Sequence, residues 1–406
     1  MSPQRIVFTA LLPFASGYFM SYLLRAVNAV VAPDLVRDAG LTPAQLGLLT
    51  AAYLGAFALF QLPLGVLLDR YGPRKVQSGL LLVAAAGCLG FAAAPGFAGM
   101  FGARAIIGLG FSAGLMASYK STATWVPPER RSLANMSIMS FGAMGVLVAT
   151  APTEFLVGLI GWRQVFMVFA GFIVLVALFI FFVAPRDDTA SAPAPLRKQV
   201  DDLIAIMRLP LFWRVAPLLG LTSGVQIGIQ TLWAGPWFRD VMGFSREEVA
   251  NHLMWMAVAF MAGVLSVGVA ADFLGRRGVE PLKVMLGYNV IYMIAQAVIA
   301  LRVDGLMFPA WLAVAAFGQV AVLSFPWFQS RVGPGLAGRS NATLNFAMFI
   351  AAFCSQYLVG LIIGLFPPTA TGYAPEGYSF AIGFFLVLQI AAVIWYALGW
   401  KEIHHA

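Results

Sequence analysis

The chain has 406 residues, of which 61% are hydrophobic and only 10% are charged, whereas soluble domains carry about 25% charged residues. A water-soluble domain of this length is therefore excluded. Its apolar runs reach the length of about 20 residues that a helix needs to cross a bilayer. The net charge of +8 comes from basic residues in short loops between these runs, so no nucleic-acid partner is expected.

Twelve apolar segments follow one another along the chain. We expect membrane-spanning helices over residues 7–33, 44–68, 76–94, 99–126, 132–159, 163–184, 212–236, 247–272, 282–301, 307–330, 338–366 and 377–399. The proline-rich, charged stretch after the sixth segment contains apolar residues at the spacing of a short amphipathic helix. This predicts an N-terminal six-helix bundle over 1–184, a cytoplasmic linker over 185–211, and a C-terminal six-helix bundle with a tail over 212–406.

Lysine and arginine residues predict the orientation of these helices. With the N-terminus inside, 17 of the 25 basic residues lie in cytoplasmic segments, five lie outside and three lie within spans. Because short cytoplasmic loops are enriched in Lys and Arg, we expect both termini to be cytoplasmic in a multi-pass inner (plasma) membrane protein.

The two halves share a pattern at an offset of 203 residues. Each copy reads Gly, four residues on Asp, three on Gly, and then basic residues. The first copy contains Gly65, Asp69, Arg70, Gly72 and Arg74, and the second contains Gly268, Asp272, Gly275 and Arg276. Such a repeat at half the chain length predicts two homologous, pseudo-symmetric halves.

A second match occurs at the same offset. Thr42 followed by Gln45, and Ser245 followed by Glu248, are capping boxes that would open the second helix of each half. The doubled Gly-Asp-Gly pattern then follows helices 2 and 8 on the cytoplasmic side. Its carboxylates can pair with basic groups and with a helix N-terminus, so we interpret both loops as parts of a cytoplasmic gate.

With these motifs the whole chain resembles the major facilitator superfamily. The pattern at 65–75 is similar to that superfamily's loop between helices 2 and 3. Residues 102–110, with Arg104, resemble its helix-4 motif, and Gly161-Trp162-Arg163 resembles its entry to helix 6. The resemblance implies an all-α fold of two six-helix bundles and a monomeric secondary transporter that works by alternating access. Within it, Arg104 has a structural or coupling role.

A narrower set of residues resembles the anion:cation symporter branch of that superfamily. These residues are Arg25-Ala-Val-Asn28, Gln61-Leu-Pro63 and the segment 125–130. The resemblance implies a small organic anion of carboxylate type as substrate, with protons as the coupling ion. Leu24 and Phe111 stand where the branch often has carboxylates.

Arg25 is the sharpest candidate for substrate binding. A charge inside a span costs roughly 2.5–3.5 kcal/mol and therefore faces protein or water. Its guanidinium suits a bidentate carboxylate contact, and Tyr22 and Asn28 lie nearby on the same helix. The alternative is a structural tie between helices. Lys120 is either a second cation in the cavity or a side chain that reaches the cytoplasmic interface.

Glu154 is the candidate proton carrier, because it is a carboxylate well inside a span. The alternative is a static salt bridge to Arg25 or Arg104. In the second half, Gln226, Gln230 and Trp233 share one face of helix 7. We interpret that face, together with Trp327 of helix 10, as cavity lining; polar glue between helices is the alternative.

No nucleophile triad, phosphate-binding glycine loop or metal-ligand spacing occurs in the sequence. We therefore expect no enzyme activity, no catalytic or metal-binding residues and no cofactor, with the lipid bilayer as surroundings. Two alternative functions stay open: an exporter of amphipathic drugs or metabolites, and a membrane receptor that does not transport.

Overall fold

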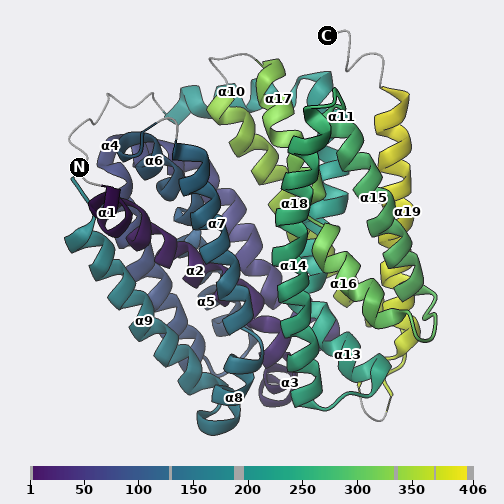
Figure 1. Ribbon diagram of the computed structural model, residues 1–406. Helices are drawn as coiled ribbons and strands as arrows, with labels where there is room; N and C mark the ends of the chain where they lie inside the picture. Colours follow the sequence, from purple (N-terminus) through teal and green to yellow (C-terminus); the bar gives the residue numbers. More distant parts are fainter. Residues whose placement is uncertain (1–2, 128–129, 187–195, 333–336, 370–371, 400–406) are drawn as a thin grey trace. The chain divides into compact units, whose positions relative to one another are not determined.

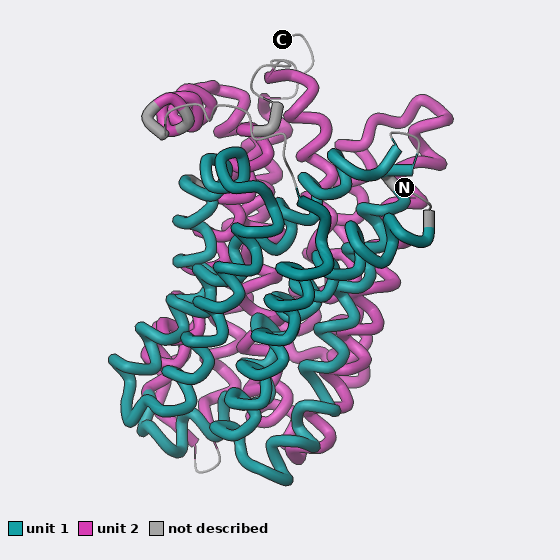
Figure 2. The backbone as a smooth tube through the Cα atoms, turned by 90° about the vertical axis from the view of Figure 1, so that its left-hand side faces the viewer, with its two compact units in different colours: residues 1–41, 52–196 teal, residues 42–51, 197–406 magenta. Residues whose placement is uncertain are grey.

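The computed structural model describes residues 3–127, 130–186, 196–332, 337–369 and 372–399, and the regular secondary structure of these residues is helical (Figure 1). The chain divides into two compact units. Unit 1 comprises Met1–Leu41 and Ala52–Leu196, and unit 2 comprises Thr42–Ala51 and Arg197–Ala406 (Figure 2). The first turns of the second expected span thus belong to unit 2.

Unit 1 contains the first ten elements, apart from the beginning of α4. They are α1 (Pro3–Ile6), the π-helical turn η1 (Val7–Leu11), α2 (Leu12–Ala26), α3 (Asn28–Ala39), α4 (Pro43–Ala93), α5 (Phe97–Phe111), α6 (Gly114–Trp125), α7 (Arg131–Val148), α8 (Ala151–Ile160) and α9 (Trp162–Val183). The first expected span is broken at Val27, between α2 and α3. α4 contains the second and third expected spans, joined at Gly72, whose φ of 75° is the left-handed region that a glycine adopts without strain.

α2 is the central helix of unit 1 and packs closely on α7. A Cβ atom at Gly145 would lie 2.3 Å from the Phe19 carbonyl oxygen, and one at Gly142 would lie 2.5 Å from the Tyr18 ring. Small residues let two helices approach in a membrane, where association depends on packing instead of the hydrophobic effect. The Gly-x-x-Gly stretch of α7 is therefore a packing surface for α2.

Unit 2 contains the remaining elements. They are α10 (Leu196–Met207), α11 (Pro210–Leu219), η3 (Gly220–Gly224), α12 (Val225–Gly228), η4 (Ile229–Trp233), α13 (Ala234–Met242), α14 (Arg246–Gly275), α15 (Pro281–Ala300), α16 (Met307–Phe317), η5 (Val320–Leu323), α17 (Ser324–Val332), α18 (Ala337–Ile363) and α19 (Pro375–Leu398). The capping box expected at Ser245 and Glu248 opens α14.

Two spans of unit 2 are irregular. The seventh span runs from α11 to α13 and contains the two π-helical turns η3 and η4. The tenth leaves the α-helical pattern after Phe317 and resumes as the short 3-10 turn η5 and then α17. Irregular backbone at this depth needs partners from the surrounding protein.

In the described part of the chain, eleven helices are long and apolar enough to cross a membrane. A twelfth is obtained if α7 and α8, which bend by 43°, form one span. The predicted all-α, twelve-helix membrane fold is thereby confirmed. In the linker helix α10, Leu203 and Ile206 are buried, and Asp202 forms an ion pair with Arg339 of α18.

Candidate functional site

Arg25 lies on the last turn of α2, with only 7% of its surface exposed. Three aromatic rings surround its guanidinium. The Cζ atom lies 5.0 Å from the centroid of Tyr22, 5.2 Å from that of Phe57 and 5.9 Å from that of Tyr53. Cation–π contacts of this kind stabilise a guanidinium out of water. We call Arg25 and these three rings the arginine box.

Hydrogen bonds from neighbouring side chains hold the two tyrosines of the arginine box in place. The Tyr53 hydroxyl lies 3.2 Å from the Ser21 hydroxyl on α2, and the Tyr18 hydroxyl donates to that of Tyr22 at 3.2 Å. Asn28, at the start of α3, donates to the Arg25 carbonyl at 3.5 Å. Tyr22 and Asn28 therefore do lie around Arg25, at the break between α2 and α3.

Arg104 of α5 is fully buried and reaches the residue before Arg25. Its Nη1 donates to the Leu24 carbonyl at 3.4 Å, and its Cζ lies 4.4 Å from the Phe91 centroid and 5.1 Å from that of Phe166. Its Nε and Nη2 have no hydrogen-bond partner among the described residues. Arg104 thus ties α5 to the end of α2.

Lys120 of α6 lies at the first signature loop. Its Nζ donates to Asp69 Oδ1 at 2.7 Å and to the Leu68 carbonyl at 2.8 Å. The Lys120 side chain is 28% exposed and that of Asp69 is 51% exposed.

The two copies of the signature pattern differ in their contacts. In the first, Arg74 donates to the Ala184 carbonyl at 3.5 Å and lies over Phe181, while Arg70 lies over Tyr71. In the second, Asp272 pairs with Arg276 one turn further along the same helix, at 2.9 Å, with both side chains mostly exposed. Gly65 lies half-buried in α4, and Gly275 ends α14.

Glu154 lies in the first turn of α8, directly after the bend from α7, and is half-buried. Its backbone N–H donates to Thr150 O at 2.9 Å. Its place at a bent span is compatible with a coupling role and with a structural one.

In unit 2 the structure brings Gln226 and Gln230 together with Gln319, which lies at the break after α16. Gln319 Nε2 donates to Gln226 Oε1 at 2.5 Å and to the Ser223 carbonyl at 3.3 Å, and Gln226 Nε2 donates to Gln230 Oε1. We call these three side chains the amide chain. The sequence pattern placed two of them on one face of helix 7, and the fold adds Gln319, whose partners lie more than ninety residues away.

The two tryptophans expected as cavity lining, Trp233 and Trp327, also lie in unit 2. Trp233 is fully buried and donates from Nε1 to the Gln356 carbonyl at 2.9 Å, with Tyr373 and Tyr378 packed around it. Trp327 lies in α17 beneath the guanidinium of Arg331, whose Cζ is 5.3 Å from its ring.

Gly228 is the position in the second half that corresponds to Arg25. A Cβ atom there would lie 2.3 Å from Ser355 Oγ and 2.9 Å from the Ala352 carbonyl oxygen. A side chain at this point of α12 would require its neighbours on α18 to shift. The cation of the first half therefore has no counterpart in the second.

A buried carboxylate that the sequence analysis missed lies at the end of α13. The Asp240 side chain is 1% exposed and accepts from Arg239 Nε at 2.6 Å, from the Tyr378 hydroxyl at 2.8 Å and from the Tyr373 backbone N–H at 3.1 Å. Burial raises the pKa of the Tyr373 phenol to about 12; the charge of Arg239 partly lowers this pKa, and that of Asp240 adds a smaller increase. The expected span ended at residue 236, which left Asp240 in a loop.

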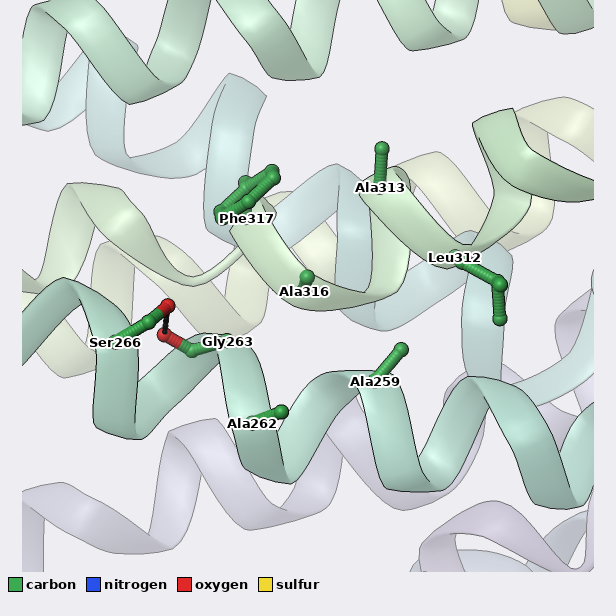
Figure 3. Close-up of a pocket in the computed structure, with 8 residues that line it drawn as sticks. All are labelled: Ala259, Ala262, Gly263, Ser266, Leu312, Ala313, Ala316 and Phe317. Atoms are coloured by element: carbon green, nitrogen blue, oxygen red, sulfur yellow. Dashed lines mark hydrogen bonds between the residues drawn. The ribbon is translucent and has the colours of Figure 1, made fainter.

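Two further observations concern metal binding and a pocket in unit 2. Among the described residues, no group of His, Cys, Asp and Glu could hold a metal ion. A pocket of about 350 Å³ between α14 and α16 is lined by small and apolar side chains, and its one hydroxyl, on Ser266, donates to the Gly263 carbonyl at 2.9 Å (Figure 3). That pocket offers nothing to an anion.

Comparisons with known proteins agree with this architecture. Residues 14–356 match the model of the Major Facilitator Superfamily. The chain is 24% identical to the probable sulfoacetate transporter SauU of Cupriavidus necator, over 85% of either chain. It is also 24% identical to the hexuronate transporter of Escherichia coli, over 94% of this chain and 91% of the relative.

The fold is also similar to that of a solved transporter. A bacterial homologue of the human lysosomal transporter Spinster, crystallised in an inward-facing, unoccupied conformation, superposes with a TM-score of 0.78. It is 17% identical, and the match covers 100% of this chain and 98% of that one.

Proposed function

The chain belongs to the Major Facilitator Superfamily, and from this premise we propose that it is a secondary transporter that moves a small organic anion of carboxylate type by alternating access. The observation that carries the proposal is the arginine box. A guanidinium buried inside a span costs roughly 2.5–3.5 kcal/mol, and Arg25 is 7% exposed.

The chemistry of the box favours an anion. A guanidinium presents planar N–H donors that match the two oxygens of a carboxylate or sulfonate. Tyr22, Tyr53 and Phe57 present ring faces to the cation, which stabilise its charge without neutralising it. The arginine box therefore keeps a net positive charge, and this charge can attract an anion that gives up its hydration water on binding.

The relatives support this choice of substrate. Two of the similar proteins are named as transporters of sulfoacetate and of hexuronate, and both of those compounds are organic acids. Proteins of one fold can transport different substrates. The proposal is therefore limited to the anionic group that Arg25 would bind.

A binding experiment tests the proposal directly. Organic carboxylates and sulfonates are added to the purified protein, and the thermal midpoint is measured for wild type, Arg25→Ala and the control Arg246→Ala, an exposed arginine at the start of α14. A ligand at a hundred times its Kd stabilises the folded state by about 2.7 kcal/mol. Wild type and the control should be stabilised by at least one anion, and Arg25→Ala should not.

Two results would contradict the proposal. One is stabilisation by none of the anions, and the other is equal stabilisation of wild type and Arg25→Ala. Transport of a neutral or cationic amphipathic compound that is unaffected by Arg25→Ala would support the exporter instead. Absence of flux in liposomes under every gradient would support a receptor.

We further propose that protons drive the transport and that Glu154 carries them. The support is its place: Glu154 is a half-buried carboxylate in the first turn of α8, directly after the bend from α7. In proteoliposomes with an imposed pH gradient, Glu154→Gln should lower uptake at least tenfold, while exchange of substrate without a gradient should continue. Undiminished proton-driven uptake by Glu154→Gln would remove it as the carrier.

A further inference from the structure

The π-helical turn η3 is held by side chains from three other parts of unit 2. Gln389 Nε2 donates to the Leu221 carbonyl at 2.7 Å, and the Tyr292 hydroxyl donates to the Thr222 carbonyl at 3.4 Å. Gln319 Nε2 donates to the Ser223 carbonyl at 3.3 Å. A π turn disturbs the regular α-helical bonding, and carbonyls at membrane depth must find donors within the protein. These three donors supply them.

The Ser223 carbonyl also determines the direction of the amide chain. A backbone carbonyl can only accept, so the group that Gln319 turns toward it must be its NH2. The same nitrogen lies 2.5 Å from Gln226, which must therefore present its oxygen. Gln226 then has its NH2 on the other side, where Gln230 Oε1 accepts from it. Because Gln230 uses its oxygen in this contact, the group left at the end of the amide chain is its NH2, a donor.

Steric contacts restrict this arrangement. A Cβ atom at Gly318 would lie 2.1 Å from Gln226 Cγ, so the backbone at the break after α16 closes directly over that side chain. Gln226 is 3% exposed. Gln230 is half-buried, and its Nε2 donates to no residue in the part of the chain that the structure describes. The amide chain thus begins at a fixed carbonyl and ends in a donor without a described acceptor.

We infer that Gln230 Nε2 binds a hydrogen-bond acceptor of the transported solute, such as a carbonyl, ether or hydroxyl oxygen, and that Gln319 is the positioning residue that makes this end of the amide chain a donor. The inference rests on the proposed function, because it assigns a second polar contact to the same kind of solute. It differs from a role in helix packing, in which the last amide would end on backbone, as Gln389 does at Leu221.

The test uses three series of linear carboxylates, namely unsubstituted alkanoates, oxo acids with the carbonyl at successive carbons, and the matching hydroxy acids. Their affinities are measured by calorimetry on the purified protein. In wild type, at least one oxo acid and one hydroxy acid should bind about fivefold or more tightly than the parent alkanoate, since one hydrogen bond is worth that much. Gln230→Leu should abolish both preferences.

Two variants separate positioning from packing. Gln296→Leu, which removes another buried amide of unit 2 that donates to Tyr292, should keep both preferences. In Gln319→Glu at pH 8, the introduced carboxylate can only accept, so Gln226 and Gln230 must turn over and the end of the chain becomes an acceptor. Oxo acids, which cannot donate, should then lose their advantage, while hydroxy acids, which can, should keep it.

The outcomes distinguish the two proposals. If no carboxylate of any series binds to wild type, the proposed function fails. If carboxylates bind but oxo and hydroxy acids equal their parents, or if their advantage survives Gln230→Leu, the inference is overturned and the proposed function stands. If Gln319→Glu leaves both preferences intact, or lowers both equally, Gln319 is not the positioning residue.

Discussion

The ammonium group of Lys120 lies 2.7 Å from the Asp69 carboxylate and 2.8 Å from the Leu68 carbonyl. A cation of α6 therefore holds the loop between the second and third spans. In the other half, Asp272 has only Arg276 of its own helix as an ion-pair partner among the described residues. The first copy of the signature is tied across two helices, while the second is a local surface pair.

This difference predicts the result of a double-mutant cycle. Lys120→Met combined with Asp69→Asn should give an interaction energy of about 0.5–1 kcal/mol, the upper part of the range for exposed pairs. The Asp272→Asn and Arg276→Gln cycle should give less, because both side chains are mostly exposed. Unfolding free energies measured in detergent supply the cycles. Equal interaction energies would contradict the assignment.

The same pair predicts the binding role of Lys120. Since its ammonium is used at Asp69, Lys120→Met should change the affinity for an organic anion by no more than about twofold, the scale of an indirect effect. Arg25→Ala should abolish that affinity. Calorimetry on the two variants makes the comparison, and a loss of affinity in Lys120→Met as large as that in Arg25→Ala would mean that Lys120 also binds the substrate.

Gly228 predicts a steric penalty. Gly228→Ala places a Cβ atom 2.3 Å from Ser355 Oγ and 2.9 Å from a backbone oxygen of α18, and overpacking of this kind costs typically 1–3 kcal/mol. The control is Gly287→Ala on α15, where a Cβ atom meets nothing within 4 Å. That change should be neutral or stabilise by up to about 1 kcal/mol. Thermal midpoints that shift equally in both variants would contradict the packing seen at Gly228.

The buried contacts of Asp240 predict that Asp240→Asn strongly lowers the free energy of unfolding. Asp240→Asn keeps the shape, but whichever oxygen becomes the NH2 group then faces the Arg239 guanidinium, which can only donate. Loss of one member of a buried charge pair costs about 3–5 kcal/mol. Asp272→Asn, at a mostly exposed carboxylate, should leave the free energy of unfolding nearly unchanged. Chemical denaturation of both variants measures the contrast.

Much of the fold could be predicted because its signals are repeated. The apolar segments, the offset of 203 residues and the capping box at Ser245 follow from spacing alone. The π turns could not be predicted, because their sequences read as ordinary helix and their stability comes from Gln389, Tyr292 and Gln319, which are distant in sequence.

The candidate site was predicted where a single charge was decisive. Burial cost identified Arg25, and its neighbours on the same helix followed from helical spacing. Lys120 could not be placed, because its position near a helix end allows either direction for a long side chain. Asp240 was missed because its burial is produced by a loop more than a hundred residues further along the chain.

Trp162 and Asp38 predict a pH-dependent contribution to stability. The Trp162 indole N–H donates to Asp38 Oδ2 at 2.9 Å, and this hydrogen bond is the main cause that lowers the pKa of the Asp38 carboxyl, with Arg37 adding to it. A carboxyl whose pKa is lower in the folded state stabilises the fold above its unfolded pKa of about 3.9. That contribution is lost as the pH falls through the folded value.

Trp162→Phe should therefore lower the thermal midpoint at pH 7, and the difference from wild type should shrink as the pH falls below about 4. Trp213→Phe is the matched control, because its indole N–H donates to the Met207 carbonyl at 2.8 Å, which does not titrate. Its effect should be independent of pH. A Trp162→Phe difference that persists unchanged at pH 3 would mean that packing of the indole, and not its bond to an ionised Asp38, stabilises this end of α9.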